Sequence, residues 1–325
     1  MPLRKVVLLM STLLLALLAD SATAQIFPAR PVRIIVPFTA GGLTDVLARG
    51  LAQELTKTWS QQVIVENRPG ANTIIAAELT AKSAPDGYTL LMANDPTLSS
   101  NQYLYTRLPY DPVRDFAPVI NMVAVPSVLV ANPSLPAGSL QELIALAKRK
   151  PGEITYGTFG PGSKTHIDTE GFSALAGVRF NHVPYKGIAE VVPAVMAGQI
   201  DIALAGVSPV LPHIRSGKLK AIAMAARQRS PVLPGVPTFA EAGIPNFESR
   251  SWFGLVVPAA TPRTIIDRIA RDVSRILALN EFREKFVTGV GLELHVLMPD
   301  PFAEFLKADR ATYAIRVKNI NVKLD

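Results

Sequence analysis

The chain has 325 residues, of which 49% are hydrophobic and 18% charged, a composition typical of a globular protein with a large core. It contains no cysteine, which excludes disulfides, thiol catalysis and lipid attachment through an N-terminal cysteine. The net charge of +7 gives a modest attraction for anions, but the basic residues are scattered without an aromatic–basic stripe, so no nucleic-acid partner is expected.

The first 24 residues have the features of a cleaved export signal. Arg4 and Lys5 precede an apolar run over 6–18, and Ala22-Thr23-Ala24 matches the small-x-small cleavage pattern, so we place the cut before Gln25. The run is too short for a membrane span, which needs about 20 apolar residues. We therefore expect residues 1–24 to be a signal peptide and the mature protein to be exported.

Short apolar strands alternate with amphipathic helices after the cut, which predicts sheets with helices on both faces. Strands are expected at 33–36, 63–66, 88–92, 154–158, 181–183, 200–204, 219–225 and 252–257. Helices are expected at 44–59, 74–84, 140–150, 165–176, 189–197, 210–216, 238–242, 263–279 and 301–317.

One β-branched stretch, 119–130, is longer than a typical strand and contains Pro126, and we interpret it as a crossover between domains. Residues 25–121 plus 246–325 are expected to form domain I and residues 122–245 domain II. Two α/β domains joined by long crossovers are the plan of a hinged binding protein, whose ligands bind beyond the carboxyl ends of the strands.

Two strand-to-helix turns lie at such ends. In the first, a buried strand leads through Gly41-Gly42 into a helix, with Thr44 as the expected N-cap. In the second, a strand leads through Gly160-Pro161-Gly162 to Ser163, which could be the N-cap. Glycines let the backbone approach a ligand, and helix N-termini attract anions. Either turn alone is ordinary, but two of them facing each other across a cleft would hold a carboxylate, or one carboxylate each.

The sequence lacks the motifs of nucleotide-binding, nucleophilic and metal sites. Neither turn has a nucleotide-binding glycine pattern, and a nucleophile elbow is absent. The four histidines, His166, His182, His213 and His295, lack metal-ligand spacing. His166 could touch a ligand, and His182 is expected at a strand end. Neither a cofactor nor a metal is expected.

Eleven stretches along the mature chain resemble the Bug family of periplasmic solute-binding receptors, the extracytoplasmic component of tripartite tricarboxylate transporters. They are Pro31-Val32-Arg33-Ile34-Ile35-Val36-Pro37-Phe38, Ala40-Gly41-Gly42 with Thr44-Asp45, Val65-Glu66-Asn67-Arg68-Pro69-Gly70-Ala71, Ala84-Pro85-Asp86-Gly87-Tyr88-Thr89-Leu90-Leu91, Leu108-Pro109-Tyr110-Asp111-Pro112, Asp115-Phe116-Ala117-Pro118-Val119, His182-Val183-Pro184-Tyr185-Lys186-Gly187, Gly198-Gln199-Ile200-Asp201, Gly217-Lys218-Leu219-Lys220, Val236-Pro237-Thr238 with Glu241-Ala242-Gly243, and Trp252-Phe253-Gly254-Leu255 with Pro258-Ala259.

The resemblance implies an α/β, type II-like Venus-flytrap fold, with a mainly parallel sheet flanked by helices in each domain. It implies a periplasmic monomer without catalysis that presents a small organic carboxylate to membrane transporter subunits. The carboxylate would be held largely by backbone amides and ordered water. The implied ligand contacts are Phe38, Thr39, Ala40, Gly41, Gly42, Thr44 and Asp45 from the first turn and Gly160, Gly162, Ser163, Thr165 and His166 from the second.

The chain departs from the family pattern in three places. Asn72-Thr73 replaces a pair of glycines, so the pocket wall there is expected to differ. Ala205 stands where some members carry an aspartate facing the cleft, which argues against an amino acid ligand. Lys164 replaces a position that is often small, and it could favour a second carboxylate or point to solvent.

Two rival functions are also compatible with the sequence. A sensor subunit of a signalling system would use the same closed form to report to a different partner. A secreted hydrolase or isomerase would need a nucleophile and a base that no motif shows, although Asp45 and His166 could meet across the cleft.

Overall fold

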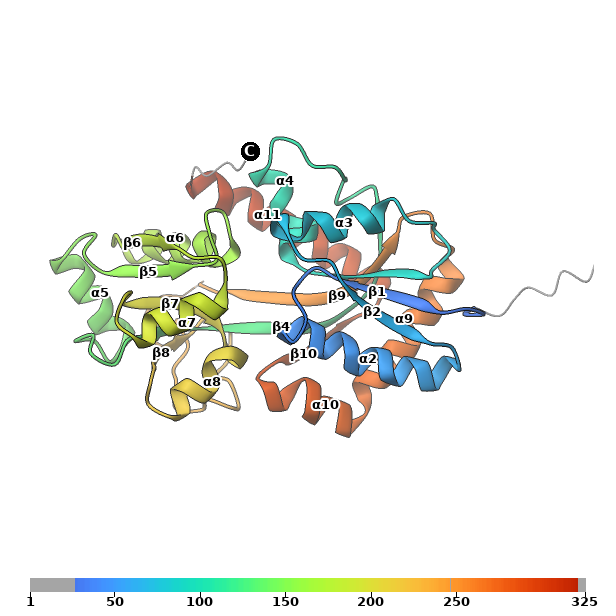
Figure 1. Ribbon diagram of the computed structural model, residues 1–325. Helices are drawn as coiled ribbons and strands as arrows, with labels where there is room; N and C mark the ends of the chain where they lie inside the picture. Colours follow the sequence, from blue (N-terminus) through green and yellow to red (C-terminus); the bar gives the residue numbers. More distant parts are fainter. Residues whose placement is uncertain (1–26, 246, 321–325) are drawn as a thin grey trace, which may run out of the picture.

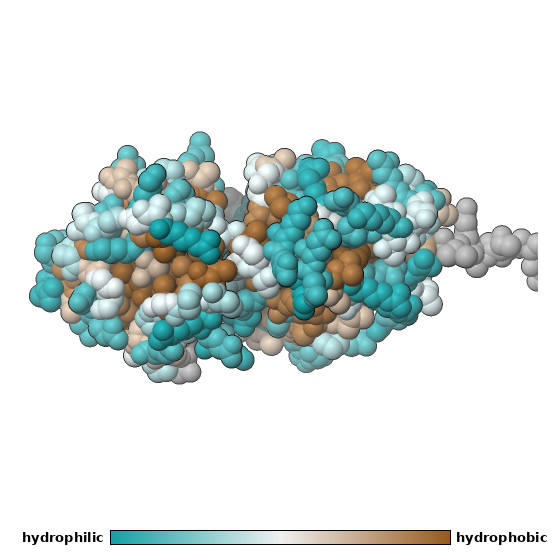
Figure 2. All heavy atoms as spheres, turned by 90° about the horizontal axis from the view of Figure 1, so that it is seen from below, coloured by the Kyte–Doolittle hydropathy of each residue, from teal (hydrophilic) through white to brown (hydrophobic). Residues whose placement is uncertain are grey.

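The computed structural model describes residues 27–245 and 247–320, with side chains up to Lys318, and the predicted signal peptide lies outside this part of the chain. The described residues form two lobes (Figure 1). Seen from below, the outline of the molecule narrows between them (Figure 2). None of the helices at 27–245 or 247–320 is long and apolar enough to cross a bilayer.

The first lobe is built on a sheet in the order β2-β1-β3-β9-β4, with β10 on the other side of β4. Its strands are β1 (Val32–Val36), β2 (Val63–Asn67), β3 (Thr89–Ala93), β9 (Arg250–Pro258), β10 (Glu293–Leu297) and the first part of β4 (Phe116–Ala131). Its helices are α2 (Leu43–Trp59), α3 (Ile74–Ala81), α4 (Asn101–Leu104), α9 (Arg263–Ala278), α10 (Asn280–Phe286) and α11 (Pro299–Ile320). Three short helical turns complete it, η1 (Ala71–Thr73), η2 (Pro96–Ser100) and η3 (Thr288–Val290).

The second lobe continues the same sheet from the far part of β4 through β7, β5 and β6, with β8 also paired to β4. Its strands are β5 (Thr155–Thr158), β6 (Asn181–Pro184), β7 (Ile202–Gly206) and β8 (Lys220–Met224). Its helices are α5 (Leu140–Arg149), α6 (Lys164–Ala176), α7 (Ile188–Met196) and α8 (Val207–Arg215).

Strand β4 crosses from one lobe to the other, as the sequence predicts for 119–130. It pairs with β9 up to the register Pro126↔Arg250, and from Ser127 onward it pairs with β7. Proline has no N–H to donate to a ladder, so a change of partner at this residue is physically natural. Beside Pro126, the Ser127 amide donates to the Ser249 carbonyl over 3.2 Å. The chain returns to the first lobe just before β9, so this bond places the second crossing between the lobes next to the first. The division into moving domains at 121/122 and 245/246 stays a prediction.

The strand directions decide which loops face the junction between the lobes. Strands β1 and β2 run parallel, as do β1 and β3, and β3 and β4 both run antiparallel to β9, so β1 runs with β4 toward the second lobe. Strand β5 runs parallel to β7, which is antiparallel to β4, so β5 points toward the first lobe. The carboxyl ends of β1 and β5 therefore face the same junction from opposite sides (Figure 1). The sheet is mixed in both lobes, because the crossing strands β4 and β9 run antiparallel to the strands beside them.

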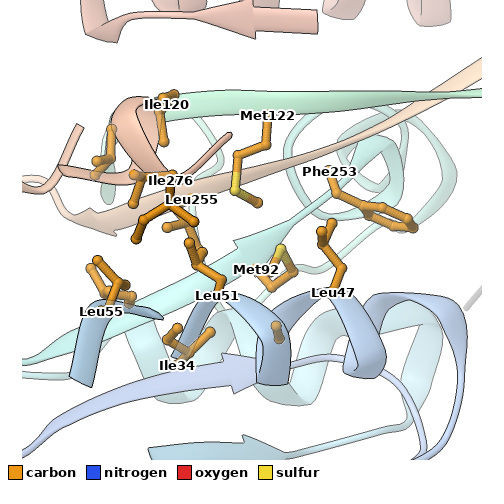
Figure 3. Close-up of a cluster of buried hydrophobic side chains, with 14 of the residues drawn as sticks. Ile34, Leu47, Leu51, Leu55, Met92, Ile120, Met122, Phe253, Leu255 and Ile276 are labelled. Atoms are coloured by element: carbon orange, nitrogen blue, oxygen red, sulfur yellow. The ribbon is translucent and has the colours of Figure 1, made fainter. Parts of the chain in front are cut away.

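Helix α2 shows how the first lobe is held together. Leu47, Leu51 and Leu55 recur at four-residue spacing, so they form one stripe that packs over Ile34 of β1 (Figure 3). The three leucines are at most 1% exposed. Burying each contributes about 1.5–3 kcal/mol, which fixes the helix whose first turn meets the junction.

Most predicted elements agree with the structure to within about three residues, but the helix expected at 238–242 is wrong. This segment forms turns in which the Glu241 amide donates to Thr238 Oγ1 over 3.1 Å and the Thr238 amide to Glu241 Oε2 over 2.8 Å. These reciprocal bonds resemble a helix start. Gly243 follows with φ +91°, a left-handed conformation that stops propagation after a single turn.

Candidate functional site

The first glycine loop, residues 38–45, joins β1 to α2 and is tied down by its own aspartate. Asp45 Oδ2 accepts a hydrogen bond from the Gly41 amide and another from Arg49 Nε, each over 2.9 Å. Its Oδ1 accepts from Asn67 Nδ2 over 2.9 Å, and the same Nδ2 donates to the Phe38 carbonyl over 3.0 Å. The loop is thereby closed at both ends, and Asn67 anchors it to the end of β2.

These contacts set the charge of Asp45. Burial acts to raise its pKa, but the hydrogen bonds from Arg49, Gly41 and Asn67 together hold the pKa below its usual value. The carboxylate is ionised at neutral pH and its oxygens are occupied by donors from its own loop and its surroundings. Its observed role is to shape the loop.

Helix α2 begins one residue earlier than expected, and the predicted N-cap is wrong. Gly42 occupies the N-cap position in an extended conformation, and no side chain accepts a hydrogen bond there. Thr44 lies within the first turn and is buried. A glycine N-cap leaves the first amides of the helix without a side-chain acceptor, so they are open to an external one at the positive end of the helix dipole.

The loop residues fall into two groups by exposure. Thr39, Ala40, Gly41 and Gly42 are exposed at the junction edge of the first lobe. Phe38 is half-buried against the core. The exposed part of this loop therefore consists mainly of backbone and small side chains.

The second glycine loop, residues 159–166, joins β5 to α6. Gly160 and Gly162 have φ of +106° and +70°, a region that favours glycine. Ser163 is the N-cap, as predicted, because its Oγ accepts from the His166 amide over 3.4 Å. The same Oγ donates to the Gly160 carbonyl over 2.7 Å, and Thr165 Oγ1 accepts from the Phe159 amide over 3.2 Å. Hydroxyl groups thus stabilise this loop as the carboxylate of Asp45 stabilises the first.

His166 supports the second loop from within. Its Nδ1 accepts a hydrogen bond from the Gly162 amide over 3.1 Å, which leaves the proton of the neutral ring on Nε2. Its ring stacks on that of His182, with centroids 4.1 Å apart, and the ring of Tyr156 lies nearly parallel to both, 5.0 Å from His182 and 6.4 Å from His166. Burial lowers the pKa of His166, while burial and the neighbouring His166 lower the pKa of His182 to about 4. Both rings are therefore neutral at pH 7.

Lys164 was expected either to favour a second carboxylate or to point to solvent, and in the structure it does neither. Its Nζ forms an ion pair with Asp168 one turn along α6, and the lysine side chain is only 13% exposed. It also donates to Ser249 Oγ over 3.3 Å. The lysine is held within the protein, so it neither points to solvent nor offers a free cation to a second carboxylate. Ala205 is buried on β7, and Lys186 is exposed.

Four residues that shape the two loops were not predicted from the sequence. Arg49 and Asn67 donate hydrogen bonds to Asp45. Asp168 and Arg316 form a 2.8 Å ion pair behind the second loop. The i,i+4 spacing of Lys164 and Asp168 on a helix could have indicated their pairing. Arg316 had no such signal, because it lies 148 residues from Asp168.

Two further features of the described residues bear on the chemistry of the site. Among residues 27–245 and 247–320, no group of three or more histidine or acidic side chains is arranged to hold a metal ion. A polar surface pocket of about 490 Å³ lies on the first lobe between α4 and β4, lined by Gln102, Tyr105, Thr106, Leu108, Pro109, Tyr110, Asp111, Pro112, Arg114 and Asp115. It includes neither glycine loop.

Comparison with known proteins identifies the class. The model of the tripartite tricarboxylate transporter family receptor matches residues 47–321. Protein BugT of Bordetella pertussis is 38% identical over 308 residues, which cover 94% of both chains. A Pseudomonas sp. protein from the tcbD-tcbE intergenic region is 33% identical, over 91% of this chain and 88% of that protein.

Solved structures agree with this assignment. The R. palustris protein Rpa4515, solved with adipate, superposes with a TM-score of 0.84 at 33% identity, covering 91% of this chain and 99% of that one. MatC from Rhodopseudomonas palustris, solved with bound malate, gives a TM-score of 0.77 at 32% identity, covering 90% and 100%. The predicted α/β fold class of a periplasmic binding protein is thereby confirmed. The chain belongs to the tripartite tricarboxylate transporter receptor family.

Proposed function

We propose that the protein is a periplasmic receptor that captures a small organic carboxylate between its two lobes and presents it to the membrane subunits of a tripartite transporter. Membership of the receptor family supports the transport role, and the expected signal peptide supports the location. The similar structures with adipate and malate make dicarboxylates the first class to test.

The observation that carries the proposal is the facing arrangement of two helix N-termini. Helices α2 and α6 begin directly after β1 and β5, whose carboxyl ends point at each other across the junction. Each start presents backbone amides and the positive end of a helix dipole, and a carboxylate is the natural ligand for such a pair.

The proposed contacts divide into backbone and side-chain groups. In the first glycine loop they are Phe38, Thr39, Ala40, Gly41, Gly42, Thr44 and Asp45, and in the second Gly160, Gly162, Ser163, Thr165 and His166. We assign direct contact first to Thr39, Ala40, Gly41 and Gly42, which are exposed. Asp45 and His166 shape the loops from behind through their bonds to the Gly41 and Gly162 amides.

The same contacts favour binding over catalysis. An enzymatic role would need Asp45 as a base or His166 as its partner. Asp45 is ionised and accepts three hydrogen bonds, and His166 Nδ1 already accepts one. We therefore propose a monomeric receptor that acts without a cofactor and returns its ligand unchanged. Chemical conversion of a bound acid, followed by mass spectrometry, would contradict this.

The decisive experiment measures binding of adipate, malate and a wider panel of organic acids by calorimetry, after native mass spectrometry of the purified protein. The test variant is Gly42→Leu. A Cβ at Gly42 meets only the Thr39 carbonyl, at an ordinary 3.5 Å, so the loop tolerates the side chain while the leucine covers the open amides. We expect an affinity loss of at least tenfold, which corresponds to about 1.4 kcal/mol.

The matched control is Gly235→Leu, at an exposed glycine in the second lobe where a Cβ has open space around it. This variant should bind as the parent does. Unchanged affinity in Gly42→Leu would show that the first glycine loop does not hold the ligand.

A further inference from the structure

A third contact joins the lobes besides the two crossing strands, and it is made by the C-terminal helix. The first part of α11 belongs to the first lobe, where Phe302 and Leu306 are buried in one cluster with Trp252 of β9. Its later part reaches toward α6 of the second lobe (Figure 1). There Tyr313 and Val317 are buried in one small cluster with Ile167.

Charged groups reinforce this apolar contact. Asp168, the residue after Ile167, has a fully buried side chain. Its Oδ1 accepts from Arg316 Nη1 of α11 over 2.8 Å, and its Oδ2 accepts from Lys164 and from Ser249 Oγ. Arg316 Nη2 also donates to the Glu248 carbonyl over 3.1 Å.

Two acidic residues of the first lobe interact electrostatically with the same lysine. Asp95, just after β3, is buried, and Asp309 of α11 is half-buried. Burial raises the pKa of both carboxyl groups, and the positive charge of Lys164 acts against this rise. Asp309 is fixed by Ser99 Oγ over 2.6 Å and by Trp252 Nε1 over 3.1 Å. Arg316 of the first lobe thus forms an ion pair with Asp168 of the second, and the charge of Lys164 in the second lobe acts on the two acids of the first.

The position of these bonds indicates how the contact behaves during domain motion. Arg316 and Asp168 both bond to the backbone or side chains of residues 248 and 249, where the chain passes from the second lobe back to the first. Ser249 Oγ also lies within hydrogen-bond distance, 3.3 Å, of Ser127 Oγ, beside the other crossing. Groups beside the crossings lie near the axis of any hinge bending and move little, unlike groups at the rim.

We propose that the α11–α6 contact, closed by Arg316 and Asp168, is a pivot that stays formed while the lobes open and close. It restricts the motion to bending of the two crossing strands about one axis. It also anchors the first turn of α6, and with it the second glycine loop, to the first lobe. Asp168 and Arg316 act as positioning residues, because they hold the loop without being its ligand contacts.

The test measures the distance between the lobes in the absence of ligand, so it is independent of whether a carboxylate binds. The chain has no cysteine, so Lys148→Cys on α5 and Arg271→Cys on α9, both exposed, give one spin-label pair across the lobes. Pulsed electron spin resonance then reports the distribution of distances. We expect Arg316→Met and Asp168→Asn to broaden this distribution relative to the parent.

The control is Arg263→Met, which removes an arginine–aspartate pair with Asp300 inside the first lobe and should leave the distribution unchanged. Arg316→Lys keeps the cation but loses the two-pronged contact, and we expect a smaller broadening; it serves as the test if Arg316→Met does not fold by circular dichroism. Folded variants with the parent distribution would overturn the pivot. So would equal broadening in the Arg263→Met control, because the effect would then not be specific to the contact between the lobes.

Discussion

At the scale of single residues, Asp45 is a buried acid that shapes the first glycine loop, where we propose that an anion binds. Its charge is balanced by Arg49 and its oxygens are filled by Gly41 and Asn67. Removing it leaves those donors without their acceptor. We expect Asp45→Ala to lower the free energy of unfolding by about 1–3 kcal/mol, the cost of unsatisfied partners. The carboxylate affinity should fall with it.

The comparison for this prediction is Asp86→Ala. Asp86 pairs with Arg30 at the surface and accepts one hydrogen bond from the Tyr88 amide over 3.1 Å, against the three that Asp45 accepts, so its loss should cost about 1 kcal/mol or less. Urea denaturation of both variants measures the difference. Equal costs would mean that the contacts of Asp45 do not stabilise the first glycine loop.

The stacked histidines should make the free energy of unfolding fall as the pH is lowered. The folded protein holds the pKa of His182 at about 4, below its ordinary 6.5, because of burial and the neighbouring His166. As pH falls from 6.5 to 4 the unfolded chain takes up a proton that the folded chain does not, so the free energy of unfolding falls. We expect His182→Gln, which does not titrate, to lose less stability than the parent between pH 7 and pH 5. Urea denaturation at the two pH values checks this, and parallel losses would contradict it.

At the scale of elements, the turn η1 stores strain beside the junction. Ala71, Asn72 and Thr73 have φ of +44°, +49° and +75°, although none is glycine. Polar contacts hold them there, since Asn72 Nδ2 donates to Asn101 Oδ1 over 2.7 Å and Thr97 Oγ1 to Thr73 Oγ1 over 2.9 Å. Asn72 and Thr73 stand where the family pattern has two glycines, and the backbone at both positions is still left-handed.

Because of this strain, we expect a substitution by glycine in η1 to stabilise the protein, whereas such substitutions usually destabilise it. A left-handed residue other than glycine costs about 1–2 kcal/mol, so Ala71→Gly should raise the free energy of unfolding, by up to about 1 kcal/mol after the added entropy of the unfolded chain. The same change at Ala311, exposed within α11, should lower it by about 0.5–1 kcal/mol. Thermal denaturation of the pair tests both signs, and a loss of stability in Ala71→Gly would argue that this turn is unstrained.

The elements also show what sequence can predict. Strands such as β1 and helices such as α2 follow from apolar periodicity, and the crossover β4 follows from its length and β-branched residues. The short, polar α10 and the edge strand β10 were not predicted. Helix α10 buries only Phe282, and no residue of β10 is fully buried, so neither has the apolar face that marks an element in a sequence. Both glycine loops were found from their glycines and their place after strands. The bonds that shape them join distant residues, such as Asp45 to Asn67, and depend on the tertiary fold.

At the scale of the whole molecule, stability should be distributed unevenly. The centre of β4 is flanked by β9 and β10, and Val119, Ile120, Met122 and Val123 are fully buried. The exposed parts of the two glycine loops lie outside the regular ladders. We expect hydrogen exchange in the ligand-free protein to be slowest in β4 and fast in residues 39–42, with slowing in the loops when a carboxylate is added. Loop exchange as slow as that of β4 would contradict this distribution.

The hydrogen bond between Ser127 and Ser249 shows that the segment between the two crossings could be exchanged as one piece of sequence. Because the two crossings meet there, the segment between them leaves and re-enters the first lobe at a single point in space. The first lobe is therefore interrupted in sequence but continuous in structure, and the segment between the crossings is a cassette that could be exchanged between relatives without moving the chain ends. The interchange would succeed only if the incoming cassette carried counterparts of Ile167 and Asp168 to meet the C-terminal helix.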